Sequence, residues 1–211
     1  MTVDTGFLLN PPATPADLKA LESDSDRNWV LYHLPYSEKS QAQPLAHWNL
    51  FFTRSGPLNL RTHDMWCRLH DPAARITTIL LPTLADSYLR QKDNFIAGAD
   101  FSYAACVARA ERSINGDVRQ DDLDKAVTLF WSATQSISLE IVRQLPKEGI
   151  KWVLLRSEAK AIQDGRLVVD MTLMDEDLKL LAYGKAVDML VPAQRWVKND
   201  SKEGSVRLMK I

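Results

Sequence analysis

The last third of the chain constrains the fold most, because residues 127–142, VTLFWSATQSISLEIV, alternate between apolar and polar side chains. A period of two is typical of a β-strand with one buried face. Gln135 is the one polar residue on the predicted apolar face, where a buried amide would need hydrogen-bond partners. The other members of that face are Val127, Leu129, Trp131, Ala133, Ile137, Leu139 and Ile141.

Three more strands are predicted after this one, each preceded by a short turn sequence. LPKEG leads into 150–162, QDG into 166–174, and DEDLK into 180–191. QDG is typical of a β-hairpin. Because the turns are short, we expect the four strands to form an antiparallel meander in sequence order.

The middle of the chain predicts two shorter strands and two helices. The strands, at 47–54 and 63–69, flank the turn SGPLN. The apolar segment 71–89 is predicted to be a helix, and 102–114 is consistent with another. In the first helix the expected N-cap is Asp71 and the first-turn proline Pro72, while Pro82 predicts a kink or a later start. Its apolar stripe comprises Leu80, Leu81, Leu84, Ala85, Tyr88 and Leu89.

These elements predict an α+β fold in which a long antiparallel sheet wraps around a central helix, the apolar helix of segment 71–89. Residues 45–198 would form this domain, and 199–211 a C-terminal tail. Residues 1–44 are Pro-rich and polar, and we expect a surface arm or connector there. Within the arm, TPADLKALE predicts a helical turn with Thr14 as N-cap.

Composition argues against several classes of partner. The chain has 211 residues, and its 26 basic and 27 acidic side chains give a net charge of −1, so nucleic acid is not expected. Cys67 and Cys106 have no companion at metal-ligand spacing, which predicts no metal site. The eight glycines form no phosphate loop, so no cofactor is predicted.

The sequence also predicts neither secretion nor membrane insertion. The N-terminus has no basic segment followed by an apolar one, and no apolar run approaches the roughly 20 residues that cross a bilayer. We therefore expect a cytoplasmic protein with no membrane partner.

Several stretches together resemble the C-terminal half of the double-hot-dog acyl-CoA thioesterase-like proteins common in fungi. They lie within residues 8–198 and include DMWCRL, LADSYL, VDMLVPAQR and the long segment SATQSISLEIVRQLPKEGIKWVLLRSEAKAIQDGRLVVDMTLMDEDLKLLA. The resemblance implies a hot-dog fold and an acyl-CoA or similar hydrophobic acyl substrate. Such relatives carry another hot-dog module first, with the ligand groove between modules. The resemblance therefore implies that this chain works as a homodimer.

The resemblance also implies a catalytic set of Asp, Thr and Gln that orients and activates water. Matched motif by motif, LADSY places Asp86 at the Asp position and ATQSISLEIVR places Thr134 at the Thr position. LLAYGKAVDML places Ala186 where the Gln is expected. An alanine side chain neither donates nor accepts a hydrogen bond, so the set is incomplete.

Each candidate catalytic residue also has a structural interpretation. Asp86 is either a general base near the groove or a residue on the polar face of its helix. Thr134 either binds the same water or is an ordinary β-branched strand residue. Gln135 either replaces the missing Gln or bonds to a backbone carbonyl.

Four further residues are predicted to bind substrate. Trp66, Tyr88 and Trp131 would line an apolar groove, although tryptophans are mostly core or interface anchors. Lys185, on the last strand, would meet a CoA phosphate or a substrate carboxylate. The alternative for Lys185 is a solvated strand lysine.

Three functions fit these residues. The first is hydrolysis of an acyl-CoA or related thioester, with Asp86 as base. The second is a pocket recruited to secondary metabolism, which promotes cyclisation, isomerisation or cycloaddition of a hydrophobic intermediate by proximity. The third is a non-catalytic binding module.

Overall fold

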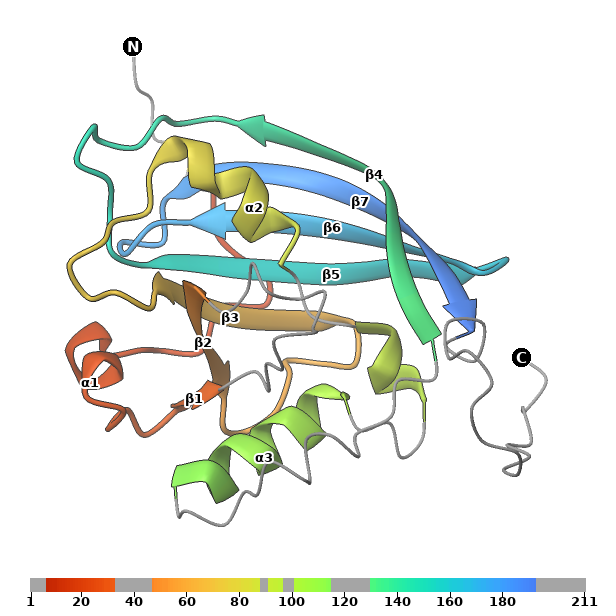
Figure 1. The fold of residues 1–211 in the computed structure, drawn as a ribbon, viewed down its shortest axis with the longest axis horizontal. Coiled ribbons are helices and arrows are strands. Elements are labelled where there is room, and N and C mark those ends of the chain that lie inside the picture. Colours follow the sequence, from red (N-terminus) through yellow and green to blue (C-terminus); the bar gives the residue numbers. More distant parts are fainter. Residues whose placement is uncertain (1–6, 33–46, 88–90, 97–100, 115–129, 193–211) are drawn as a thin grey trace, which may run out of the picture.

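The computed structural model of the chain describes residues 7–32, 47–87, 91–96, 101–114 and 130–192. Within these residues the strands form one antiparallel sheet in the order β1-β2-β3-β5-β6-β7-β4 (Figure 1). The strands are β1 (Trp29–Tyr32), β2 (Trp48–Thr53), β3 (Thr62–Leu69), β4 (Phe130–Ile141), β5 (Val153–Gln163), β6 (Arg166–Met174) and β7 (Leu180–Pro192). The described helices are α1 (Leu18–Glu22), α2 (Leu81–Ala85) and α3 (Tyr103–Ile114), with short 3₁₀ helices η2 (Thr78–Leu80) and η3 (Gln91–Phe95).

The predicted strands are confirmed, but the predicted meander is wrong in one respect. β5, β6 and β7 pair in sequence order through two hairpins. β4 pairs with β7 at the far edge, and β5 pairs with β3 on its other side. The strand that comes first along the chain therefore lies last in this part of the sheet, a non-local pairing that turn sequences do not reveal.

The sheet separates two apolar cores, one packed against each of its faces. On the inner face, alternate residues such as Leu155, Val169 and Ala186 pack with α2 and α3. On the outer face, Trp66, Leu154 and neighbouring residues pack with α1 and the segment around it. Each core removes a continuous apolar surface from water, which is the main favourable contribution to folding.

The helix predicted over 71–89 is shorter than expected. Asp71 caps a turn, because its Oδ1 accepts a hydrogen bond of 2.8 Å from the Ala73 backbone amide. Ile76 then exchanges backbone hydrogen bonds with Ile150, so the chain there is extended. α2 begins only at Leu81 with Pro82 in its first turn, the later start that this proline predicts.

The expectation that the sheet wraps around this segment is confirmed. Figure 1 shows the sheet curving around α2 from β5 through β6 and β7 to β4. Leu81, Leu84 and Ala85 of α2 are fully buried in the inner core. The described helix of greatest length is α3, and it covers the inner face at the β1 end of the sheet.

The described part of the predicted arm, residues 7–32, is integrated with the sheet. Trp29–Tyr32 form the edge strand β1, and Asp17 rather than the predicted Thr14 caps α1, by accepting a 2.9 Å hydrogen bond from the Lys19 amide. Arg156 on the outer face makes a buried bidentate ion pair with Asp64, at 2.6 Å for each bond. Arg156 also donates to the backbone carbonyl of Pro11, which anchors the arm to the sheet.

Candidate active site

The side chains of Asp86 and Thr134 are in contact on the inner face of the sheet. Asp86 is the residue that ends α2, and Thr134 lies on β4, 48 positions later in the sequence. The Thr134 hydroxyl donates a hydrogen bond of 3.3 Å to Oδ1 of Asp86. The two positions that the resemblance selects are therefore adjacent in space, on the same face of the sheet as α2.

A second carboxylate, Asp188, lies beside this pair and was missed in the sequence. Asp188 on β7 is directly opposite Thr134 in the β4–β7 pairing, so both side chains lie on the inner face. Only 2% of Asp188 is exposed. The available signal was its spacing, because Asp188 follows Ala186 by two residues and therefore shares its face of the strand.

The electrostatic environment raises the pKa of the Asp86 carboxyl above its ordinary value of 3.8. The largest cause is partial burial, which disfavours the charged form. The hydrogen bond from Thr134 opposes this by lowering the pKa, and the negative charge of Asp188 raises it further. Asp86 as a residue is nevertheless exposed, so its carboxylate is accessible from solvent.

A β-bulge at Gln135 changes which side chains of β4 reach the inner face. Thr134 pairs with Asp188 and Ser136 pairs with Val187, so Gln135 is the extra residue. Gln135 is exposed, and its amide nitrogen donates a 3.4 Å hydrogen bond to the Ala133 carbonyl. The prediction of a buried amide is wrong, and the bond to a backbone carbonyl is the structural alternative for this residue.

Because of the bulge, the predicted apolar face of β4 is divided between the two sides of the sheet. Ile137, Leu139 and Ile141 lie opposite Ala186, Gly184 and Ala182 and face inward. Before the bulge it is the even-numbered residues that face inward, including Ser132 opposite Leu190. The Ser132 hydroxyl is buried and has no hydrogen-bond partner among the described residues.

The predicted substrate-binding residues do not gather around Asp86. Trp66 is buried in the outer core, on the opposite face of the sheet. Trp131 pairs with Val191, and Lys185 pairs with Ser138 and Asp170, which places both on the outer face as well. Tyr88 lies outside the described residues.

The position at which the resemblance places the Gln is occupied by an alanine whose side chain is buried. Ala186 is fully buried between Ile137 of β4 and Val169 of β6. No hydrogen-bonding side chain therefore reaches the site from this position. The nearest polar group on the same face of β7 is Asp188, one inward-facing position further along the strand.

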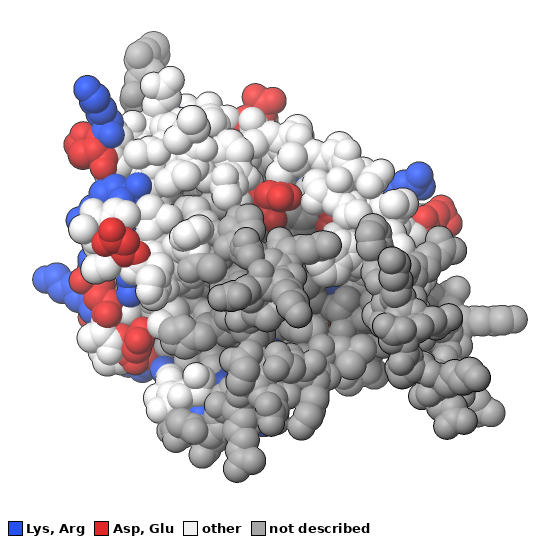
Figure 2. Space-filling view, in the orientation of Figure 1, with Lys and Arg blue, Asp and Glu red and all other residues white. Residues whose placement is uncertain are grey.

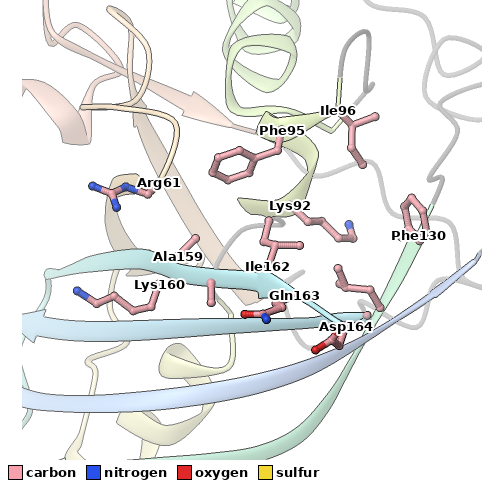
Figure 3. A pocket seen from close by; sticks show the side chains of 13 residues that line it. Arg61, Lys92, Phe95, Ile96, Phe130, Ala159, Lys160, Ile162, Gln163 and Asp164 are labelled. Carbon is pink, nitrogen blue, oxygen red and sulfur yellow. The ribbon is translucent and has the colours of Figure 1, made fainter. Parts of the chain in front are cut away.

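A largely apolar cavity of about 780 Å³ lies between η3 and the strands β4, β5 and β7. Leu190 lines it and is the next inward-facing residue after Asp188, about 7 Å along the strand. Figure 3 shows Lys92 and Phe95 of η3, and Ile96 just after it, approaching Ile162 of β5, with Phe130 of β4 at one side. Lys92 is buried and forms a 3.0 Å ion pair with Asp93.

The surface around the site is largely uncharged. Figure 2 shows that Lys and Arg lie near the rims of this view, whereas acidic atoms emerge within the white area over α2 and β4. Among the described residues no group of three or more His, Cys, Asp or Glu side chains is arranged to hold a metal ion. No described helix combines the length and the hydropathy needed to cross a bilayer.

Three comparisons place this geometry among known proteins. A family model described as "Acyl-CoA thioesterase C-terminal domain" matches residues 15–185. The chain is 28% identical over 212 residues to the thioesterase-like protein TwmA of Talaromyces wortmannii, with 97% of the chain and 59% of that protein covered. The chain thus spans about three fifths of that relative's length.

A solved structure has a similar fold. It is a conserved protein of unknown function with a hot-dog fold from Alicyclobacillus acidocaldarius, with a TM-score of 0.55 and 13% identity. The alignment covers 90% of this chain and 57% of that one. Together with the sheet order and the enclosed α2, this likeness supports the hot-dog fold that the sequence predicts.

The raised pKa of Asp86 predicts a pH-dependent effect on stability. Its pKa is higher in the folded chain than its ordinary value, so this group contributes a loss of folding stability as the pH rises from about 3.8 through the folded pKa. Asp86→Asn removes that loss. We expect the free energy of unfolding of Asp86→Asn, relative to that of the wild type, to be higher at pH 8 than at pH 4. Urea unfolding at the two pH values measures this difference. The exposed Asp177→Asn is the matched control, and an equal Asp86→Asn difference at both pH values would contradict the assignment.

Proposed function

Because the chain belongs to the acyl-CoA thioesterase C-terminal domain family, we propose that it hydrolyses the thioester of a hydrophobic acyl-CoA or a related acyl carrier. The observation that carries this proposal is the contact between Thr134 and Asp86, on the same face of the sheet as the cavity residue Leu190. A partly buried carboxylate with a raised pKa suits a general base that works near neutral pH.

In the proposed reaction Asp86 removes a proton from water while the water oxygen attacks the thioester carbonyl carbon. Thr134 positions Asp86 through its hydrogen bond. The tetrahedral intermediate then collapses, the carbon–sulfur bond breaks, and the proton passes to the departing sulfur. The products are a carboxylic acid and a thiol, and the step requires no cofactor.

The cavity supplies a place for the apolar part of the substrate. Its apolar lining includes Phe95, Phe130, Ile162 and Leu190. Burying the acyl group there contributes about 25 cal/mol for each Å² of apolar surface removed from water. The carbonyl carbon would then remain at the mouth of the cavity, near Asp86.

A second copy of the chain is proposed to complete the site. β4 is the edge strand next to the site, and it carries partly exposed apolar side chains such as Ile137 and Ile141. A long edge strand is a template for pairing with another strand, and a two-fold contact would bring two sites together. In solution we therefore expect a particle of twice the chain mass.

The second candidate function is a recruited pocket that catalyses cyclisation, isomerisation or cycloaddition. The observation that favours it is the buried Ala186, which leaves the position of the expected Gln without a donor for a thioester oxygen. An apolar cavity beside carboxylates still allows a hydrophobic intermediate to be held in a folded conformation and to lose a proton.

Removal of the base tests the proposed hydrolysis. Asp86→Asn keeps the shape of the side chain but cannot accept a proton, so we expect a loss of about 100-fold or more in kcat for CoA release from acyl-CoA esters. Asp177→Asn is the control for the loss of one carboxylate from the surface. Wild-type turnover by a folded Asp86→Asn variant would refute the role of Asp86. A wild-type protein that releases no CoA from short, medium, long or aromatic esters would favour the second function.

Narrowing the cavity tests where the acyl group binds. Ile162→Trp adds bulk to the cavity lining, and we expect it to lower kcat/KM for decanoyl-CoA about 10-fold more than for acetyl-CoA. Ile114→Trp makes the same change at an exposed position on α3. If both esters lose activity equally with Ile162→Trp, the acyl group does not occupy this cavity.

The mass in solution tests the proposed assembly. Light scattering coupled to gel filtration should give twice the chain mass, and the dimer should persist at the concentrations used for assays. A monomer that retains full hydrolytic activity would show that a second copy is not required.

A further inference from the structure

Asp188 lies near Asp86, because both are neighbours of Thr134. Thr134 is opposite Asp188 across the β4–β7 pair, where facing Cβ atoms are about 5 Å apart. The hydroxyl of the same Thr134 is 3.3 Å from the Asp86 carboxylate. Two carboxylates from distant parts of the sequence therefore share one threonine as a neighbour.

The two carboxylates differ sharply in their access to solvent. Asp86 is exposed, whereas only 2% of Asp188 is exposed. A substrate therefore reaches Asp86 but not Asp188. Because Asp188 is shielded, its charge is screened by salt far less than a surface charge would be.

The other elements packed around Asp86 bring neutral groups to this face. β4 contributes Thr134 and Ser132, and β7 contributes Ala186 in addition to Asp188. β6, which α2 contacts, presents Leu167, Val169 and Met171 inward. Among the described residues, Asp188 is accordingly the charged group that acts on Asp86 in this site.

A like charge nearby makes it harder to ionise a carboxyl group and increases its affinity for a proton. A base with a higher proton affinity transfers protons more efficiently, provided that it remains ionised at the working pH. A glutamine, which the family motif places at position 186, would have no such effect because an amide carries no charge. The carboxylate at 188 thus changes the chemistry of the set.

We propose that Asp188 is a positioning residue of this site, a buried carboxylate whose negative charge makes Asp86 a stronger proton acceptor. The inference rests on the proposed function only in one respect, namely that Asp86 uses its higher proton affinity to remove a proton from water. Its direct consequence is a coupling between two ionisable groups, which exists whether the proton comes from water or from a carbon acid.

Carboxyl-carbon NMR titration tests the coupling without any substrate. The Asp86 resonance is assigned by its disappearance in Asp86→Asn. Asp188→Asn removes the neighbouring charge, so we expect the pKa of Asp86 to fall. Asp177→Asn, which removes a charge from the exposed turn before β7, should leave the pKa of Asp86 unchanged. An unchanged pKa of Asp86 in folded Asp188→Asn would overturn the inference.

A second variant keeps the test decisive. Asp188→Ser, smaller and also neutral, is prepared in parallel in case Asp188→Asn fails to fold. We expect the pKa of Asp86 to fall in this variant as well. An unchanged pKa of Asp86 in folded Asp188→Ser would overturn the inference.

The activity readout separates this inference from the proposed function. With hexanoyl-CoA as substrate, Asp188→Asn should move the acidic limb of kcat/KM to lower pH, an effect that a purely structural role would not produce. Wild-type hydrolysis by Asp86→Asn would defeat the proposed function. An unmoved acidic limb in Asp188→Asn, with Asp86→Asn inactive, would defeat only the role of Asp188.

Discussion

The pairing of β4 with β7 is the interaction on which the site depends. It places Thr134 opposite Asp188 and brings both under the end of α2, where Asp86 lies. The two strands approach closely, since a Cβ on Gly184 would lie 2.2 Å from the backbone oxygen of Ser138. A glycine at this position is therefore needed for the pairing, because a larger side chain would push β4 away from β7.

Much of the fold could be predicted from the sequence because the signals for it are local. Alternating side chains give the strands, short turns give the β5–β6 and β6–β7 hairpins, and Pro82 marks the start of α2. The placement of β4 could not be predicted in this way. Its partner β7 lies at the other end of the predicted set of strands, and only the packing of the whole sheet around α2 selects that pairing.

The site shows the same division between local and non-local information. The family motifs assign Asp86 and Thr134 to one site, because such motifs carry spatial information that periodicity lacks, whereas the hydrogen bond between the two side chains is visible only in the structure. Gln135 and Trp131 were misplaced because one extra residue in a bulge reverses every side chain before it. The motifs do not indicate Asp188, because the position they assign to the Gln is Ala186, two residues before this carboxylate.

These features bring two carboxylates together on the inner face of the sheet, the face that also carries the cavity residue Leu190. The inner core holds α2 against the sheet, the bulge sets the face of Thr134, and the buried Asp188 acts on the exposed Asp86. In the proposed function, the cavity lined by Leu190 binds the apolar part of the substrate and Asp86 acts as the base. In the proposed reaction the basicity of Asp86 depends on its partial burial and on the charge of Asp188.

A crystal structure with a non-hydrolysable acyl-CoA thioether tests the central claim most directly. The account predicts that the acyl chain lies between Ile162 and Phe130, with the atoms that replace the thioester next to the Asp86 carboxylate. An acyl chain bound on the outer face, near Trp131 and Lys185, would contradict the account.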